Sequence, residues 1–171
     1  MRDTVRLGRL GGIPIGVNWT LIAFAGLLAV GLAGSRLPHD APGYSDTAYN
    51  LVGAGTAVAL LIGVLLHEVG HAIVARRAGH RVDGITLSWM GGITRIEGDA
   101  RRPGVELGIA AIGPAVSAVL GGLLFAGREV AIGAGAGQLV VAALGWLAVI
   151  QVALALFNLL PAAPLDGGRV L

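Results

Sequence analysis

The chain has 171 residues, of which 55% are hydrophobic and only 13% are charged, and its net charge is +2. Soluble domains carry about 25% charged residues, so the composition favours an integral membrane protein. The absence of cysteine excludes a disulfide-stabilised secreted scaffold. All twelve basic residues are arginines that lie between apolar stretches rather than in one stripe, a pattern that fits membrane topology signals better than nucleic-acid binding.

Four apolar stretches are long enough, or nearly so, to cross a bilayer, which takes about 20 residues of helix. They cover residues 17–34, 49–78, 105–126 and 138–160. We therefore expect an all-α polytopic membrane protein with about four transmembrane helices, forming a single membrane core over residues 1–171.

The arginines predict how these helices are oriented. Ten of the twelve precede the first stretch, lie between the second and third, or follow the fourth. Only Arg36 and Arg128 lie in the other two connections, at 35–48 and 127–137. Because positive charge collects on the cytoplasmic side, we expect a multi-pass protein of the cell membrane, with its N-terminus in the cytoplasm and these two loops outside.

The second apolar stretch contains the sequence HEVGH at 67–71. His67 and His71 are four residues apart, so they share one face of a helix and can bind a single Zn²⁺. Glu68 follows the first histidine, where it can hold and deprotonate a zinc-bound water. Three such residues are costly inside a membrane helix and therefore indicate a function. The alternative is a structural polar cluster at the end of the helix.

Between the second and third stretches, residues 82–97 form two short β-prone runs around Gly91-Gly92. They predict a small β-hairpin on the cytoplasmic side, and the alternative is an ordinary connecting loop. An extended substrate segment could pair with the edge of this hairpin around Gly92 to Ile96.

A catalytic zinc usually takes three protein ligands, and the histidine and acidic residues closer to His71 have unsuitable spacing. Asp166 follows the fourth stretch, where Pro161 and Pro164 must end the helix. The second and fourth stretches cross the membrane in the same direction, so Asp166 comes to the depth of His67 and His71. We therefore predict Asp166 as the third ligand; the alternative is that Asp166-Gly167 is only a turn.

Taken together, these motifs resemble those of the site-2 proteases, which are intramembrane zinc metalloproteases. The matching segments are HEVGH at 67–71, NLLPAAPLDGG at 158–168, Gly91-Gly92, Ile112-Gly113-Pro114 and GIPIGVNWT before the first stretch. The resemblance implies that His67, His71 and Asp166 bind one zinc ion per chain and that Glu68 is the catalytic acid and base. One departure is Ser117, at a position where the family often has asparagine.

The family resemblance also implies the reaction: hydrolysis of peptide bonds in or near transmembrane segments of membrane proteins. Asn158 could donate a hydrogen bond to the substrate or the oxyanion, or it could serve as a polar contact between helices. The resemblance is to the compact subgroup without an inserted PDZ domain, and it implies further membrane helices beyond Leu171 and hence a truncated chain.

The expected partners are a single-pass or polytopic membrane protein substrate and the lipid bilayer, and a second copy of the chain in a homodimer is a further candidate. No nucleic acid is expected. Two alternative functions use the same polar residues differently: a membrane transporter that binds a metal, and a non-catalytic membrane chaperone.

Overall fold

The computed structural model describes residues 5–89, 91–97, 103–162 and 165–170. The elements in chain order are β1 (Val5–Leu10), β2 (Ile13–Val17), α1 (Trp19–Gly31), the π-helical turn η1 (Leu32–Arg36), α2 (Leu37–Asp40), α3 (Asp46–Arg77), β3 (Arg81–Ser88), β4 (Gly91–Glu97), α4 (Pro103–Gly133), α5 (Gln138–Asn158) and the 3₁₀ turn η2 (Asp166–Val170).

Four helical segments among the described residues are long and apolar enough to span a membrane, which confirms the predicted polytopic helical fold. They are Trp19–Asp40, α3, α4 and α5. The first and third continue to Asp40 and Gly133, so parts of the two predicted external loops are helical. Hydropathy marks only the apolar part of a helix, whereas backbone hydrogen bonding continues until a cap or a helix-breaking residue ends it.

The helix ends follow from local chemistry. Asn18 and Ser45 cap α1 and α3 by accepting hydrogen bonds from the backbone N–H groups of Thr20 and Ala48, at 3.0 and 3.3 Å. The last helix ends at Asn158, three positions before Pro161, as expected for a chain that a proline forces out of helical geometry.

The small sheet has the order β1-β2-β3-β4. The predicted hairpin is present as β3–β4, and an N-terminal hairpin, β1–β2, joins it through parallel pairing of β2 with β3. Gly11 and Gly12 form the N-terminal turn with φ of 57° and 82°, values that a tight hairpin turn requires. The N-terminal hairpin was not predicted, and neither was its pairing with β3, which lies some seventy residues from β2 in the sequence.

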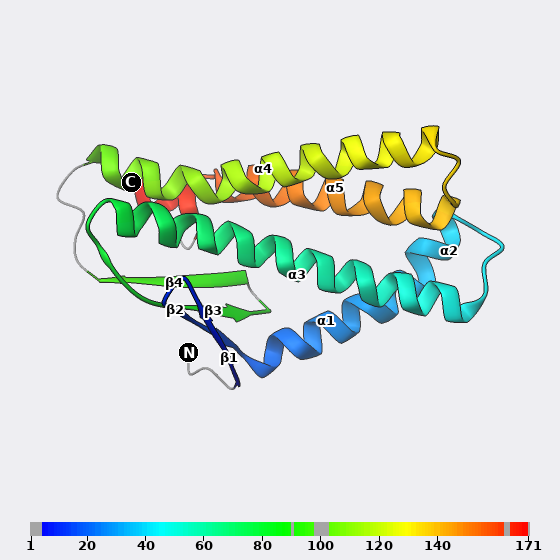
Figure 1. Cartoon of the computed structure of the whole chain (residues 1–171), viewed down its shortest axis with the longest axis horizontal. Coiled ribbons are helices and arrows are strands. Elements are labelled where there is room, and N and C mark those ends of the chain that lie inside the picture. The colour runs from blue at the N-terminus through cyan, green and yellow to red at the C-terminus, as the bar shows by residue number, and fades with distance from the viewer. Residues whose placement is uncertain (1–4, 90, 98–102, 163–164, 171) are drawn as a thin grey trace.

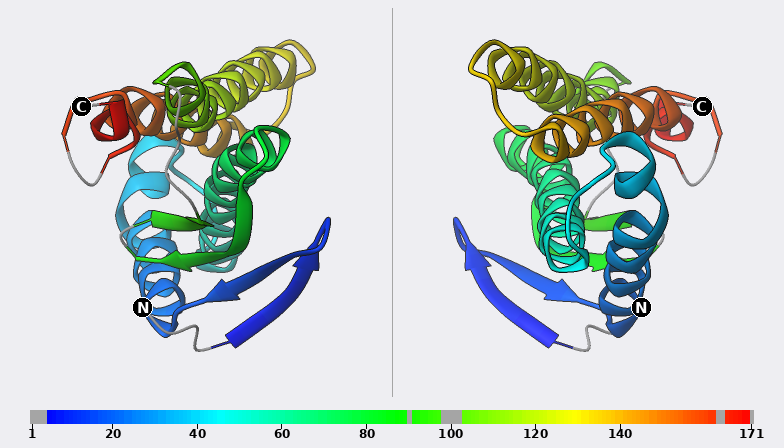
Figure 2. Two further views of the ribbon diagram at one scale, coloured as in Figure 1. Left: turned by 90° about the vertical axis from the view of Figure 1, so that its left-hand side faces the viewer. Right: turned by 90° about the vertical axis from the view of Figure 1, so that its right-hand side faces the viewer.

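Helix α3 lies between the sheet on one side and helices α4 and α5 on the other (Figure 1). The sheet covers the C-terminal half of α3, while α4 and α5 run along its other side (Figures 1 and 2). Near the sheet, Ile13, Ile85 and Ala72 belong to one buried cluster. A second buried cluster, which includes Leu37 and Leu139, joins the other ends of the helices.

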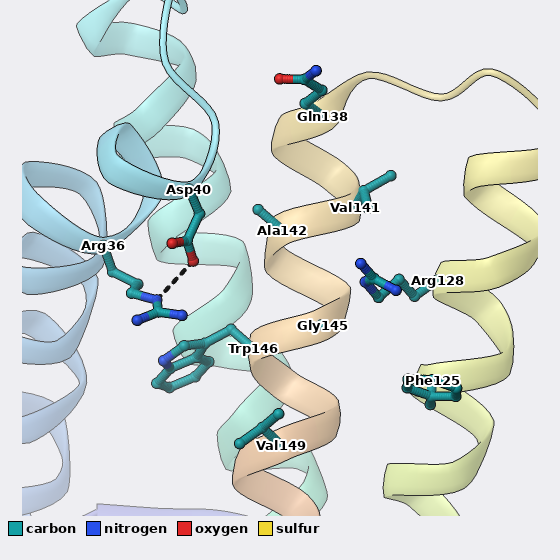
Figure 3. A pocket seen from close by; sticks show the side chains of 10 residues that line it. All are labelled: Arg36, Asp40, Phe125, Arg128, Gln138, Val141, Ala142, Gly145, Trp146 and Val149. Carbon is teal, nitrogen blue, oxygen red and sulfur yellow. Dashed lines mark ion pairs between the residues drawn. The ribbon is translucent and has the colours of Figure 1, made fainter.

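The end of the molecule remote from the sheet contains a cavity of about 700 Å³ beside α5 (Figure 3). Arg36 lies on one side of α5 and is ion-paired with Asp40 at 2.7 Å. Arg128 of α4 lies on the other side. None of the residues of the HEVGH motif lines this cavity.

Candidate metal centre

The HEVGH motif lies in the C-terminal half of α3, and its polar side chains are buried. His67, Glu68 and His71 are 4%, 7% and 2% exposed. The two imidazole rings lie with their centroids 4.9 Å apart, as the four-residue spacing requires on a helix with 3.6 residues per turn. The motif therefore forms one polar cluster within an apolar helix.

Asp166 of η2 lies against both histidines. One carboxylate oxygen, Oδ2, is 3.0 Å from His67 Nε2 and 3.1 Å from His71 Nε2. The three ligand atoms all lie within 4.8 Å of one another. The fold thus brings together the three predicted ligands, from positions up to 99 residues apart.

The outer nitrogens of the two rings have their own partners. His71 Nδ1 donates a hydrogen bond to the carbonyl oxygen of Ile109 at 2.6 Å, and His67 Nδ1 is 3.0 Å from Ser117 Oγ. Because a carbonyl can only accept, the proton of neutral His71 is on Nδ1, and Nε2 keeps the lone pair that a metal needs. Such outer partners orient the histidine ligands of metal sites.

Helix α4 makes room for the rings at Gly113. A Cβ at this position would lie 2.2 Å from His71 Nε2 and 2.5 Å from His67 Nε2, far inside van der Waals contact. The glycine therefore leaves open the space into which both Nε2 atoms point.

The carboxyl group of Glu68 is oriented by β4. Thr94 Oγ1 donates a hydrogen bond to Glu68 Oε2 at 2.7 Å and is 3.2 Å from the Glu68 carbonyl oxygen. A Cβ at Gly92 would lie 2.2 Å from Glu68 Cγ. Gly92 pairs with Leu87 within the hairpin rather than forming its turn, so it is needed here for the close approach of Glu68.

Asp166 lies in the turn after α5, outside the spanning helices. Burial raises the pKa of its carboxyl group, but hydrogen bonds from His67 and His71, when these rings carry a proton on Nε2, outweigh burial and lower the pKa to about 2. The carboxylate is therefore ionised at neutral pH, which is the form that binds a metal.

A groove of about 320 Å³ opens onto these residues. His67, Glu68 and Asp166 line one part of it, and Asn158 and the start of β4 line another. Asn158 Nδ2 donates to the carbonyl oxygen of Leu154 at 3.0 Å. Asn158 thus lies beside the metal-binding cluster, with one of its donors bound to its own helix.

This donor set fits zinc. Two imidazole nitrogens and one carboxylate oxygen are ligands that zinc accepts, and three protein ligands leave a fourth position for water or substrate. The open space beside Gly113 lies where the ligand atoms converge.

The residues not predicted from the sequence are those that support the cluster. In the sequence, Ser117 is only a departure from a family pattern, and Thr94 is only part of a β-prone run. Neither a hydroxyl on α4 nor one on β4 gives a recognisable sequence signal, although Gly113 and Gly92 both lie in motifs that resemble those of the site-2 proteases.

The fold and the site together define a helical membrane protein with a buried His–His–Asp cluster and an adjacent glutamate. The sequence matches Peptidase family M50 over residues 55–135 and 129–171. The chain belongs to this family, that of the site-2 proteases.

Individual relatives agree with this assignment. The chain is 42% identical over 170 residues to a Mycobacterium tuberculosis protein named "Putative zinc metalloprotease Rip3", covering 99% of this chain and 43% of that protein. It is 31% identical over 172 residues to "Zinc metalloprotease MJ0392" from Methanocaldococcus jannaschii, covering 100% of this chain and 45% of that protein. The chain therefore spans less than half the length of these relatives.

The structure is similar to that of the site-2 protease from Methanocaldococcus jannaschii, with a TM-score of 0.65 and 28% sequence identity. The similarity covers 97% of this chain and 68% of that one. It therefore extends over nearly all of the described fold, including the helices that carry the metal-binding cluster.

Proposed function

We propose that this chain contains the active centre of an intramembrane zinc metalloendopeptidase, which hydrolyses peptide bonds in or near transmembrane segments of membrane proteins. The observation that best supports the proposal is the buried Glu68 carboxyl group, which lies next to a zinc ligand and lines the groove beside the His–His–Asp cluster. A site that only stored or transported a metal would have no need for this fourth group.

His67, His71 and Asp166 would hold the zinc ion. Bound there, zinc would polarise the scissile carbonyl and lower the pKa of its water towards about 7. Glu68 would accept a proton from the attacking water and return it to the leaving amine. Thr94 supports this role because its hydrogen bond orients the carboxyl group.

Asn158 lines the same groove and is proposed to bind the substrate carbonyl or the oxyanion. An amide NH₂ group carries two N–H donors, so the bond to Leu154 is compatible with a second bond to substrate. This role requires the side chain to remain at the groove during the reaction.

The substrate segment is proposed to bind in an extended form along β4. This strand is at the edge of the sheet, and Gly91, Gly92 and Ile93 line the groove beside Glu68. Backbone pairing with an edge strand would hold an unwound substrate next to the catalytic residues.

The proposal is tested with the Glu68→Gln variant. The purified chain, loaded with zinc, is incubated in detergent with a panel of single-pass membrane proteins, and the products are identified by mass spectrometry. We expect hydrolysis by the wild type to fall by at least about a hundredfold in the variant, while the zinc content stays at the wild-type level.

Two results would contradict the proposal. Equal hydrolysis by the wild type and the variant would exclude Glu68 as the acid and base. A wild-type protein that binds zinc and takes up metal into vesicles, with the same uptake in Glu68→Gln, would indicate a metal transporter instead.

A further inference from the structure

A glutamine is buried in the middle of α5. Gln151 is 1% exposed, in a helix that is apolar enough to span a membrane. No described residue forms a hydrogen bond with its side-chain oxygen, Oε1, which is itself buried. Buried polar atoms almost always have a hydrogen-bond partner in the protein or in ordered water, and a polar side chain inside a membrane helix is costly unless it serves a purpose. Gln151 Oε1 therefore indicates a site for a hydrogen-bond donor.

The side chain of Gln151 is directed at α3. A Cβ at Gly63 would overlap with Gln151 Nε2 and would lie 2.9 Å from Gln151 Cδ, so the glycine leaves room for this amide. Helix α4 packs closely on the same part of α5, since a Cβ at Gly121 would lie 2.7 Å from Val152 Cγ2. Gln151 therefore lies where α5 is packed against both α3 and α4.

This position is one helical turn from the metal-binding cluster. On α3, Gly63 is four residues before His67. On α4, Gly121 is four residues after Ser117, whose Oγ lies 3.0 Å from His67 Nδ1. Both glycines lie on the side of the His67–Ser117 contact remote from the sheet, because α3 and α4 run in opposite directions (Figure 1). Four residues rise about 6 Å along a helix, so the Gln151 amide is about one turn from this contact.

The hydroxyl group of Ser117 has a proton to donate. When His67 Nε2 is a zinc ligand, the ring proton is on Nδ1 and is donated to Ser117 Oγ. The serine hydroxyl then keeps its own proton for a second hydrogen bond. Its side chain is fully buried and makes no other hydrogen bond within the described part of the chain. A donor without an acceptor at Ser117 and an acceptor without a donor at Gln151 are thus buried about one turn apart.

The groove at the metal-binding cluster extends towards Gln151. Val64 and Leu154 are among the residues that line this groove. Val64 follows Gly63 in the chain, and Leu154 is three residues after Gln151 on α5. Water in the groove therefore has a path of only about one helical turn to Gln151.

We propose that a buried water molecule accepts a hydrogen bond from the Ser117 hydroxyl group and donates one to Gln151 Oε1. Two hydrogen bonds of about 2.8 Å each span nearly the rise of one helical turn, and two polar partners suffice to hold a buried water. Gln151 is then a positioning residue for His67. The water fixes the direction of the Ser117 O–H bond, so that an oxygen lone pair stays turned towards His67 Nδ1. The role rests on the proposed function, since it matters only where His67 binds zinc.

The first test measures the zinc affinity of the detergent-purified chain by competition with a fluorescent zinc chelator. Gln151→Met keeps nearly the same side-chain length and volume but removes the amide. We expect its zinc affinity to fall about threefold to tenfold, which is less than for a group that contacts a ligand directly. The matched control is Gln138→Met, the same substitution at an exposed position of α5, and its affinity should equal that of the wild type.

A double variant separates positioning from packing. Because Gln151 would act through Ser117, adding Gln151→Met to Ser117→Ala should lower zinc affinity no further. Losses that add in the double variant would show a role in packing against Gly63 and would overturn the proposal, as would unchanged affinity in Gln151→Met. A wild-type protein that binds no zinc would instead contradict the proposed function, and this role with it.

The second test does not depend on any variant. In a crystal structure of the wild type at a resolution that shows ordered water, we expect a water molecule within hydrogen-bonding distance of both Ser117 Oγ and Gln151 Oε1. An ordered interface without such a water would overturn the proposal. Circular dichroism reports whether Gln151→Met folds, and should it not fold, the crystal structure decides the question.

Discussion

Gly113 shows at the scale of one residue how a missing side chain allows the site to form. We predict that Gly113→Ala abolishes zinc binding, because the new methyl group would lie 2.2 Å from His71 Nε2. The rings cannot simply move aside, since Ser117 and Ile109 hold their outer nitrogens. Zinc content of the purified protein, measured by atomic absorption, checks the prediction.

The control is Gly122→Ala on the same helix, where a Cβ meets no other atom within 4 Å. Its zinc content should equal that of the wild type. Zinc retained at full stoichiometry in Gly113→Ala would contradict the assignment of His67 and His71 as ligands.

Ser117 contacts a predicted zinc ligand without being one itself. Its hydroxyl is fully buried and lies 3.0 Å from His67 Nδ1. We predict that Ser117→Ala lowers zinc affinity about 10- to 100-fold, as is typical when an outer partner of a ligand is removed. Competition with a fluorescent zinc chelator measures the change, and Ser35→Ala, at an exposed position, serves as the control.

At the scale of elements, the edge position of β4 underlies the proposed pairing with the substrate, which a substitution that changes the backbone can test. We predict that Ile93→Pro lowers peptide hydrolysis while zinc stays bound, because proline removes a backbone N–H group from β4 and distorts the edge along which an added strand would pair. The side chain of Ile93 points away from α3, so the substitution removes little packing. Turnover and zinc content are measured on the same preparation.

Ile93→Val is the matched variant, since it keeps both the strand propensity and the N–H group. Its turnover should remain close to that of the wild type. Equal turnover in the proline and valine variants would rule out substrate pairing at this position.

At the scale of the whole molecule, the arginine distribution predicts that the sheet end of the helices faces the cytoplasm. The chain contains no cysteine, so single cysteines can be introduced without background. Ala78→Cys follows α3 at the sheet end, and Ala134→Cys follows α4 at the opposite end; both positions are exposed.

We expect a membrane-impermeant maleimide to label Ala134→Cys in intact cells and Ala78→Cys only after the membrane is opened. We base this expectation on the positive-inside rule, because ten arginines lie on one side of the spans and two on the other. The reverse labelling pattern would place the metal-binding cluster nearer the external face.

The spanning helices and the HEVGH motif could be predicted from sequence because their signals are local. Hydropathy over some twenty residues identifies a span, and a four-residue spacing places two histidines on one helix face. The position of Asp166 near the histidines could also be predicted. The number of membrane crossings before a span determines its direction, so the second and fourth spans run the same way. In the structure, Asp166 Oδ2 lies 3.0 Å from His67 Nε2.

Pairing between segments that are distant in the sequence could not be predicted, because it leaves no local sequence signal. The parallel register of β2 with β3 depends on how α1 and α3 pack, and no residue in 13–17 specifies its partner. The same holds for the hydroxyl groups of Ser117 and Thr94, which reach His67 and Glu68 across 50 and 26 positions of chain. A serine or threonine has no particular sequence signal until the fold brings a partner within hydrogen-bonding distance. The residues of the His–His–Asp cluster and Glu68 could therefore be identified in the sequence, whereas the side chains that orient them were decided by tertiary packing.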